Sequence, residues 1–480
     1  MNMLIVSLIP LVGGLLLATI GLKKDRSRTT VSMGIAALTS VLALCLLTAE
    51  SRTLTVISYT ETFTLEFCLD AHGKFFLALM AFLWPLAVLY ASEYMEHEER
   101  PNSFFGFYLM TYGVMILFCC AGNIFTMYVL FECITLVTLP LVWHKKDDAS
   151  IRAARSYIRY SIGCAAFAFT AMILLAYYGG EISGGGFDFE NIPQWILHGA
   201  FLAAFFGFGF KAAVFPICAW LPKASAAPTP VTALLHAVAV VNSGVFAIQR
   251  LIYDVFGMER LRGSLTQSVV LTASLVTVLF GACMAVREVN VKRKLAYSTI
   301  GNLGYMLFGA SLMTTGGLLG SMAHMVTHGL MKILLFFCIG IVMVKTDRVH
   351  ERQMRGLAGK MPITFGFFVF GAVALIGIPP LCGFISKYLL IEAALDFGGL
   401  WALAGPLVLL TSSVLTGIYA LSTLLPAFFM PFEASDGKPL ADSCDPGWRM
   451  LLPLSIIALA CLVAGIGSAS LLKILVGAVC

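Results

Sequence analysis

Three polar residues stand at helical spacing inside one long apolar stretch of the chain. His324, His328 and Lys332 lie in SMAHMVTHGLMKILLFFCIGIVMV at positions i, i+4 and i+8, so a helix carries them on one face. A lysine near the centre of a bilayer costs roughly 2.5–3.5 kcal/mol on insertion scales. Groups this costly indicate proton or ion movement. A metal site at the two histidines lacks a third ligand, so no metal is predicted.

Two further charges interrupt apolar stretches. Glu132, in FTMYVLFECITLVTLP, is the only acidic or basic charge between Arg100 and Lys145, and a carboxylate at that depth must be paired, hydrated or protonated. Lys211, in GFGFKAAVFPICAWLP, precedes Pro216 by five residues and is the natural partner of Glu132. The structural alternatives are an ion pair that only joins two helices and a lysine that reaches the membrane interface.

Other polar residues in apolar surroundings extend the set. His236 lies in PVTALLHAVAVVNSG, and Lys387 follows a proline pair in LIGIPPLCGFISKYLL. Proline breaks helices, and a break at membrane depth exposes backbone groups that need protein or water partners. We interpret Lys223, after WLP, as an interfacial anchor. We interpret Lys294, in VKRK, as a residue of a basic loop that marks topology.

The composition predicts an integral membrane protein. Of 480 residues, 59% are hydrophobic and 12% charged, against about 25% charged in soluble domains. The basic residues lie in short loops, which gives no support to nucleic-acid binding. The thirteen cysteines contain no CxxC pair, so no cofactor, cluster or disulfide framework is predicted. Any redox chemistry therefore belongs to another chain. The first apolar stretch, followed by KKDRSR, reads as a membrane helix and not as a cleaved signal peptide.

The elements that must position these residues are membrane helices. We expect an all-α polytopic fold with about fourteen spans, at roughly 3–22, 30–48, 72–90, 104–122, 123–143, 155–178, 197–220, 230–254, 264–286, 293–314, 316–345, 361–392, 401–430 and 449–475. The alternating segment TLTVISYTETFTLEFCLD predicts a β-hairpin outside the bilayer. EISGGGFDFENIPQ is a glycine-rich loop between spans 6 and 7.

Loop charges support this count and give an orientation. Twenty-one lysines and arginines fall in one set of alternate loops and four in the other set, which holds Arg52, Arg250, Arg260 and Arg262. The positive-inside rule then places both termini on the outer side of the cell inner membrane.

Spans 4–8 and 9–13 form two blocks of five, and an odd number of spans inverts the second block relative to the first. Both blocks contain a proline-broken helix with a lysine, in spans 7 and 12. The predicted domains are 1–103 with three spans and the hairpin, 104–254 and 255–430 as inverted repeats, and 431–480 as the last span.

Four ordered segments carry a family resemblance: WLPKASAAPTPVTALLHAVAVVNSGVFAI, VKRKLAYSTIGNLGYMLFG, HMVTHGLMKILLFF and GIPPLCGFISKYLL. They resemble the antiporter-like proton-pumping subunits of respiratory complex I, membrane-bound NiFe hydrogenases and Mrp antiporters. The short chain is most similar to the D component of hydrogenase-4-type complexes.

The resemblance implies two half-channels joined by a hydrophilic axis. Glu132 and Lys211 match the family's glutamate–lysine pair, His236 the histidine of span 8, and Lys387 the exit lysine. The central relay is matched by His324, His328 and Lys332.

Two positions depart from the family pattern. Many relatives have a lysine where this chain has Asn242, so His236 must serve that step alone or through water. Many relatives have an acidic residue at the position of Lys223. The residue that admits protons from the inner side is therefore not identified in this chain.

The leading hypothesis is a proton-translocating subunit of a membrane-bound oxidoreductase complex. Its partners are other membrane subunits and a peripheral redox arm, and this chain holds no redox centre, so its status as an enzyme stays open. The first alternative is a sodium/proton antiporter of Mrp type, in which more mid-membrane carboxylates are expected. The second is a non-conducting scaffold, which has no need of a lysine and histidine axis.

Overall fold

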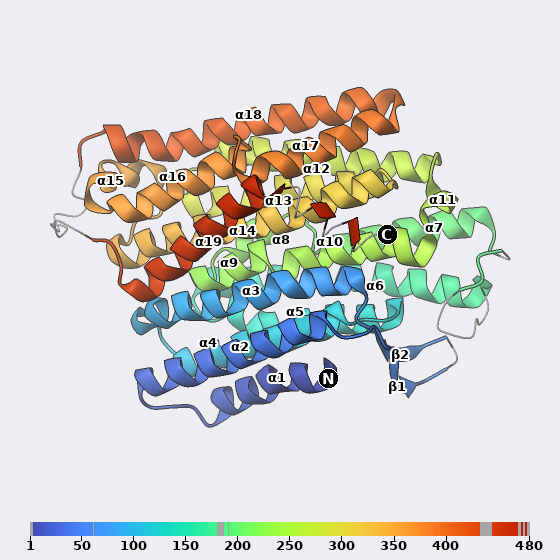
Figure 1. The fold of residues 1–480 in the computed structure, drawn as a ribbon, viewed down its shortest axis with the longest axis horizontal. Coiled ribbons are helices and arrows are strands. Elements are labelled where there is room, and N and C mark those ends of the chain that lie inside the picture. The colour runs from blue at the N-terminus through green and yellow to red at the C-terminus, as the bar shows by residue number, and fades with distance from the viewer. Residues whose placement is uncertain are drawn as a thin grey trace.

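Long apolar helices lie side by side and run roughly along one direction (Figure 1). The structure is a computed structural model that describes residues 3–60, 62–179, 187–190, 192–432, 444–468, 472–473 and 476–477. Within these residues, ten helices are long and apolar enough to cross a membrane, and three shorter apolar helices accompany them. The all-α polytopic prediction is confirmed, whereas the number of crossings and the inverted repeats stay predictions.

The first half of the chain begins with two helices and a hairpin. Its elements are α1 (Met3–Thr19), α2 (Asp25–Leu47), β1 (Leu54–Ser58), β2 (Thr64–Phe67), α3 (Ala71–Tyr94), η1 (Met95–His97), α4 (Pro101–Cys119), α5 (Ile124–Val142), α6 (Asp148–Gly179), α7 (Gln194–Gly209), α8 (Trp220–Ala224), α9 (Thr229–Ala237), α10 (Val240–Arg250) and η2 (Leu251–Phe256).

The second half is helical throughout. Its elements are α11 (Met258–Leu261), α12 (Leu265–Arg287), α13 (Val291–Ser311), α14 (Thr315–Thr346), η3 (Glu351–Met354), α15 (Leu357–Lys360), α16 (Pro362–Ile376), α17 (Cys382–Phe397), α18 (Gly399–Phe429) and α19 (Trp448–Ile466). Parts of the predicted glycine-rich loop (181–194) and of the last predicted span (449–475) lie outside the described residues.

Polar side chains fix where the main helices begin. Asp70, Asn123, Ser264, Asn290 and Thr314 each accept a hydrogen bond from the backbone N–H three residues on, at 2.7–3.1 Å. These contacts satisfy donors that a helix leaves free in its first turn. They start α3, α5, α12, α13 and α14 at set positions.

The predicted hairpin is present. β1 and β2 pair antiparallel, with Leu54 opposite Phe67 and Ser58 opposite Thr64, and the register shifts between Thr55 and Ile57. In Figure 1 the hairpin projects from the right end of the bundle, while the connection between α1 and α2 lies at the left end.

Three predicted spans are broken rather than continuous. In span 7, helix α7 ends at Gly209 and α8 starts at Trp220, and in span 12 a gap separates α16 from α17. Both breaks contain the prolines that predicted them. Span 8 is also broken, between α9 and α10, which the sequence analysis missed because no proline lies within residues 238 and 239.

Candidate functional site

The predicted relay residues share one helix. His324, His328 and Lys332 lie on α14, an unbroken helix of 32 residues, and all three side chains are completely buried. α14 packs against α9, α13, α16, α17 and α19. The predicted helix is thus confirmed, and these neighbours supply the partners of its polar residues.

Neutral oxygens surround Lys332. Its Nζ donates to the carbonyl of Leu295 at 3.1 Å and to the Ser298 hydroxyl at 2.6 Å, both on α13. The Ser298 hydroxyl in turn hydrogen-bonds the Tyr419 hydroxyl of α18. The ammonium group therefore has hydrogen-bond acceptors but no carboxylate in direct contact within the described residues.

His324 is held on both sides of its ring. Nδ1 lies 2.9 Å from the Ser386 hydroxyl of α17, and Nε2 lies 3.1 Å from the Asn302 side-chain oxygen of α13. The ring also stacks on Tyr305, with ring centres 5.2 Å apart. These contacts fix the orientation of the imidazole.

Lys387 lies on α17, and its side chain reaches back across the break in span 12 to the end of α16. Its Nζ donates to the last carbonyls of α16, those of Leu375 and Ile376, at 2.9 and 3.0 Å, and to the Ser413 hydroxyl at 3.0 Å. Carbonyls at a helix C-terminus lack intrahelical partners and carry partial negative charge. Nζ also lies 5.3 Å from the centre of the Tyr305 ring, so Tyr305 contacts both Lys387 and His324.

Two buried histidines have no hydrogen-bond partner among the described residues. This holds for both ring nitrogens of His328 and of His236. The His328 ring centre lies 6.3 Å from that of His324, and the His236 ring centre lies 5.2 Å from that of Phe336. Because buried polar groups are normally hydrogen-bonded, water is the expected partner of these nitrogens.

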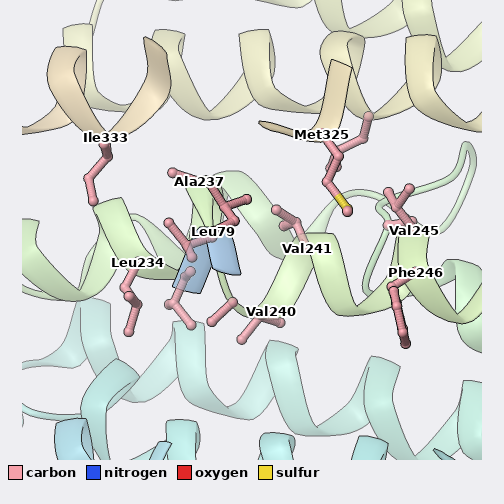
Figure 2. Close-up of a cluster of buried hydrophobic side chains, with 14 of the residues drawn as sticks. Leu79, Leu234, Ala237, Val240, Val241, Val245, Phe246, Met325 and Ile333 are labelled. Carbon is pink, nitrogen blue, oxygen red and sulfur yellow. The ribbon is translucent and has the colours of Figure 1, made fainter. Parts of the chain in front are cut away.

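Apolar side chains enclose the break in span 8. Figure 2 shows Val240 and Val241 at the start of α10, with Met325 of α14 on the side of Val241 and Ile333 of α14 over Leu234 of α9. The Asn242 side chain donates to the carbonyl of Ala237 at 3.0 Å and so satisfies one backbone group that the break exposes. Asn242 therefore supports the break structurally.

Glu132 and Lys211 are near neighbours without a direct hydrogen bond. Lys211 follows the end of α7, and its Nζ donates to the Phe131 carbonyl and lies 3.6 Å from the centre of the Phe131 ring. Glu132 accepts from the Ser161 hydroxyl at 3.3 Å, and its Oε1 has no protein partner. Lys211 thus contacts the residue that precedes Glu132 in the chain, and the pairing of the two charges stays a prediction.

Glycine lets the broken spans approach one another. A Cβ on Gly244 of α10 would lie 2.3 Å from the backbone nitrogen of Ala212, beside Lys211. A Cβ on Gly329 of α14 would lie 3.2 Å from the carbonyl of Ala237. These contacts bring span 7, span 8 and α14 together, and with them Lys211, His236 and His328.

The interpretation of Lys294 as a loop residue is wrong. It lies within α13, is 1% exposed, and pairs with Glu351 while donating to the Ser422 hydroxyl at 2.8 Å. Thr423 also donates to Glu351, at 3.1 Å. The charge run suggested a membrane boundary, but a carboxylate 57 residues later in the chain compensates the buried lysine.

A second polar chain was missed by the sequence analysis. His72 Nε2 lies 2.9 Å from Gln249 Oε1, and Gln249 Nε2 donates to the Ser321 hydroxyl at 2.8 Å. Ser321 is three residues before His324 on α14, and Arg250, next to Gln249, pairs with Asp70 at 2.6 Å. His72 and Gln249 are polar residues beside apolar runs, and that signal could have identified them.

Together these residues are proton-exchanging groups on neighbouring elements of the bundle, and hydrogen bonds join some of them into clusters around Lys332, His324 and Lys387. Amines, imidazoles, hydroxyls and a carboxylate all donate and accept protons, and they follow one another from α5 to α18. The described residues contain no group of three histidine, cysteine, aspartate or glutamate side chains that could hold a metal.

Comparison with known proteins gives the family. Residues 121–416, more than half of the chain, match the family described as NADH:quinone oxidoreductase/Mrp antiporter, TM. The chain is 30% identical over 416 residues to NADH-quinone oxidoreductase subunit N of Desulforudis audaxviator, covering 84% of this chain and 81% of that one.

A second relative is longer than this chain. NAD(P)H-quinone oxidoreductase subunit 5, organellar chromatophore 1, of Paulinella chromatophora is 30% identical over 447 residues, covering 84% of this chain and 65% of the relative. The chain spans 57–65% of the length of the first curated relatives it matches.

A solved structure shares the fold. A chain in the structure of the Mrp complex from Dietzia sp. DQ12-45-1b superposes with a TM-score of 0.86 at 21% identity, covering 99% of this chain and 96% of the other. The likeness to component D of hydrogenase-4-type complexes stays a prediction, since these matches identify a family and not one component. The sequence matches and the shared fold agree that this multi-pass membrane protein belongs to the NADH:quinone oxidoreductase/Mrp antiporter family.

Proposed function

We propose that this chain is the proton-translocating, antiporter-like membrane subunit of a complex I-like or membrane-bound hydrogenase complex. It lies in the cell inner membrane with both termini outside. A peripheral redox arm and other membrane subunits supply the energy, because this chain contributes no redox centre. We also propose that residues 104–254 and 255–430 are inverted repeats, flanked by the regions 1–103 and 431–480.

The observation that carries the proposal is the way in which the buried lysines are held. Lys332 and Lys387 contact backbone carbonyls and hydroxyls, and Lys211 contacts a carbonyl and an aromatic ring. These acceptors hold an ammonium group without fixing it in a direct carboxylate pair. A purely structural lysine at this depth is expected to have such a pair.

The roles follow the order of the contacts. A charge change in a neighbouring subunit alters the interaction between Glu132 and Lys211. The proton then passes His236 and His328 through water and reaches Lys332 and His324. Lys387, linked to His324 by Tyr305, is the exit lysine.

A second outlet is available beside the exit lysine. From His324, one turn of α14 leads to Ser321 and then along the hydrogen bonds through Gln249 to His72. These three residues connect the axis with the end of α3 that carries the ion pair of Asp70 and Arg250.

The alternative is a sodium/proton antiporter of the Mrp type, which the fold of the Mrp complex supports. A sodium ion gives up its water only where several oxygen ligands replace it. Among the predicted axis residues, which lie from α5 to α17, Glu132 is the single carboxylate. Its direct contact is one hydroxyl, that of Ser161. This donor set favours protons as the transported ion.

The first experiment identifies the complex. The chain is purified gently by an affinity tag, and the proteins that come with it are identified by mass spectrometry. Iron–sulfur or hydrogenase subunits support a redox-driven pump. Recovery of other antiporter-type membrane chains alone would overturn the redox proposal in favour of the exchanger.

The second experiment tests the residues. In membrane vesicles that contain the intact complex, Glu132→Ala and Lys211→Ala are expected to abolish substrate-driven acidification while the complex still assembles. Arg26→Gln, on the exposed face of α2, is the control and is expected to pump normally. Normal pumping by both axis variants would make the glutamate–lysine pair merely structural.

A further inference from the structure

A strongly basic cavity opens at one end of the bundle, away from the proton axis. It has a volume of about 660 Å³ and lies between α6, α8, α13 and α14, within the range of roughly 300–1,000 Å³ common for ligand sites. Seven lysine and arginine side chains line it, and its described lining contains no carboxylate. The loops at this end are those predicted to face inward.

Most of these cations form no direct ion pair among the described residues. Lys145 pairs with Glu98 and Arg293 with Glu288, each at 3.0 Å. The remaining five form no ion pair among the described residues: Arg152, Arg155, Arg159, Lys223 and Lys292. Lys292 is 5% exposed and donates to one carbonyl, that of Ala227, at 2.5 Å. So many unpaired cations around one cavity repel one another unless an anion joins them.

An apolar groove continues from the basic cavity along α6. It measures about 200 Å³ and is lined by Leu139, Trp143, Ile151, Ala154, Arg155 and Ile158. Arg155 belongs to both linings, so the cavity and the groove meet at its side chain. Trp143 is 46% exposed, and tryptophan is typical of the level where the bilayer meets water.

We propose that this cavity binds the phosphate headgroup of an anionic phospholipid of the inner leaflet, with one acyl chain in the adjoining groove. Arginine matches phosphate oxygens with two parallel hydrogen bonds, and basic pockets between membrane helices bind acidic headgroups. A free phosphate ion would contact the same cations but would leave the apolar groove empty. This site is independent of the proton axis, and its test does not depend on transport.

The purified full-length chain in detergent is titrated with phosphatidylglycerol and with phosphatidylcholine, and bound lipid is counted by native mass spectrometry. The wild type is expected to prefer phosphatidylglycerol. Arg152→Gln/Arg155→Gln is expected to weaken that binding on the order of tenfold or more. Arg152→Lys/Arg155→Lys, which keeps the charge but not the two parallel hydrogen bonds, is expected to bind more strongly than the glutamine variant and more weakly than the wild type. The control Lys23→Gln/Lys24→Gln removes two exposed charges outside the cavity and is expected to bind as the wild type does.

Two further arms separate the sources of phosphate. Ile158→Trp fills the groove and is expected to weaken phosphatidylglycerol binding. Inorganic phosphate is expected to compete poorly with phosphatidylglycerol in the wild type and in every variant. Competition by inorganic phosphate that is unaffected by Ile158→Trp would assign the cavity to a free anion and overturn the lipid. Equal binding of the two lipids, or equal loss in the control variant, would also overturn the proposal.

Discussion

At the scale of single residues, the two central histidines of α14 differ in their hydrogen-bond partners. His324 has a protein partner on each ring nitrogen, whereas His328 has none. A polar group that loses its buried partner costs about 1–3 kcal/mol. We therefore expect His324→Leu to destabilise the protein by about that much more than His328→Leu, because only the former takes the partner from the Asn302 side-chain oxygen.

Thermal unfolding of the two purified variants measures this difference. Both variants are expected to reduce proton transfer, since both remove an imidazole from the axis. Equal melting temperatures would contradict the assigned hydrogen bonds, and normal transport in the His328 variant would remove that residue from the route.

The buried pair of Lys294 and Glu351 gives a second prediction. The lysine side chain is 2% exposed and the glutamate side chain 18%. Glu351→Gln leaves the more deeply buried charge unpaired and is expected to cost up to about 3–5 kcal/mol of stability. Lys294→Met is expected to cost less, because Ser422 and Thr423 still donate to the glutamate.

The double variant Lys294→Met/Glu351→Gln completes the cycle. It is expected to recover part of the loss, since no unpaired charge stays buried. Chemical or thermal denaturation measures the free energy of unfolding of the wild type, the two single variants and the double variant. If the losses of the two single variants simply add in the double variant, Lys294 and Glu351 do not interact as a pair.

The residue scale also shows how far the sequence could lead. The spacing of His324, His328 and Lys332 is a local property of one helix, so it could be predicted. Their partners Asn302, Ser386 and Ser298 come from other helices, and only packing brings them near. Lys294 was misinterpreted for the same reason, since its compensating charge is distant in sequence.

At the scale of elements, glycine decides how closely the broken spans pack. A Cβ at Gly244 would collide with the backbone of span 7 at 2.3 Å, whereas one at Gly163 of α6 would meet nothing within 4 Å. Gly244→Ala is expected to destabilise the protein by about 1–3 kcal/mol and to reduce proton transfer by displacing Lys211. Melting temperature and vesicle acidification test both effects.

Gly163→Ala is the matched control. Replacing an exposed glycine in a helix with alanine is expected to stabilise by about 0.5–1 kcal/mol and to leave transport unchanged. Equal behaviour of the two alanine variants would contradict the close approach of α10 to span 7.

Broken helices were predictable where proline causes them. The breaks of spans 7 and 12 contain Pro216 and the pair Pro379–Pro380. The break of span 8 contains no proline, and Asn242 donates to the carbonyl of Ala237 five residues earlier in the same span. An asparagine within an apolar run does not by itself indicate a helix break, so the sequence pattern did not predict this one.

At the scale of the whole molecule, the orientation in the membrane is testable. With the exposed Cys45 and Cys283 replaced by alanine, a cysteine at Thr60 in the hairpin turn is expected to react with a membrane-impermeant maleimide on intact cells. A cysteine at Lys146, in the connection between α5 and α6, is expected to react only after the cells are opened. The reverse pattern would invert the proposed topology.

The continuity of α14 has a consequence for the direction of the proposed transport. Its titratable groups occupy fixed steps of one unbroken helix, and the neighbours of Lys332 and His324 are neutral groups. A proton route along such a row would have no valve of its own, and a voltage worth about 2.3 kcal/mol per charge per 100 mV would act on it in both directions. One-way transport would then require timing imposed by the neighbouring subunits.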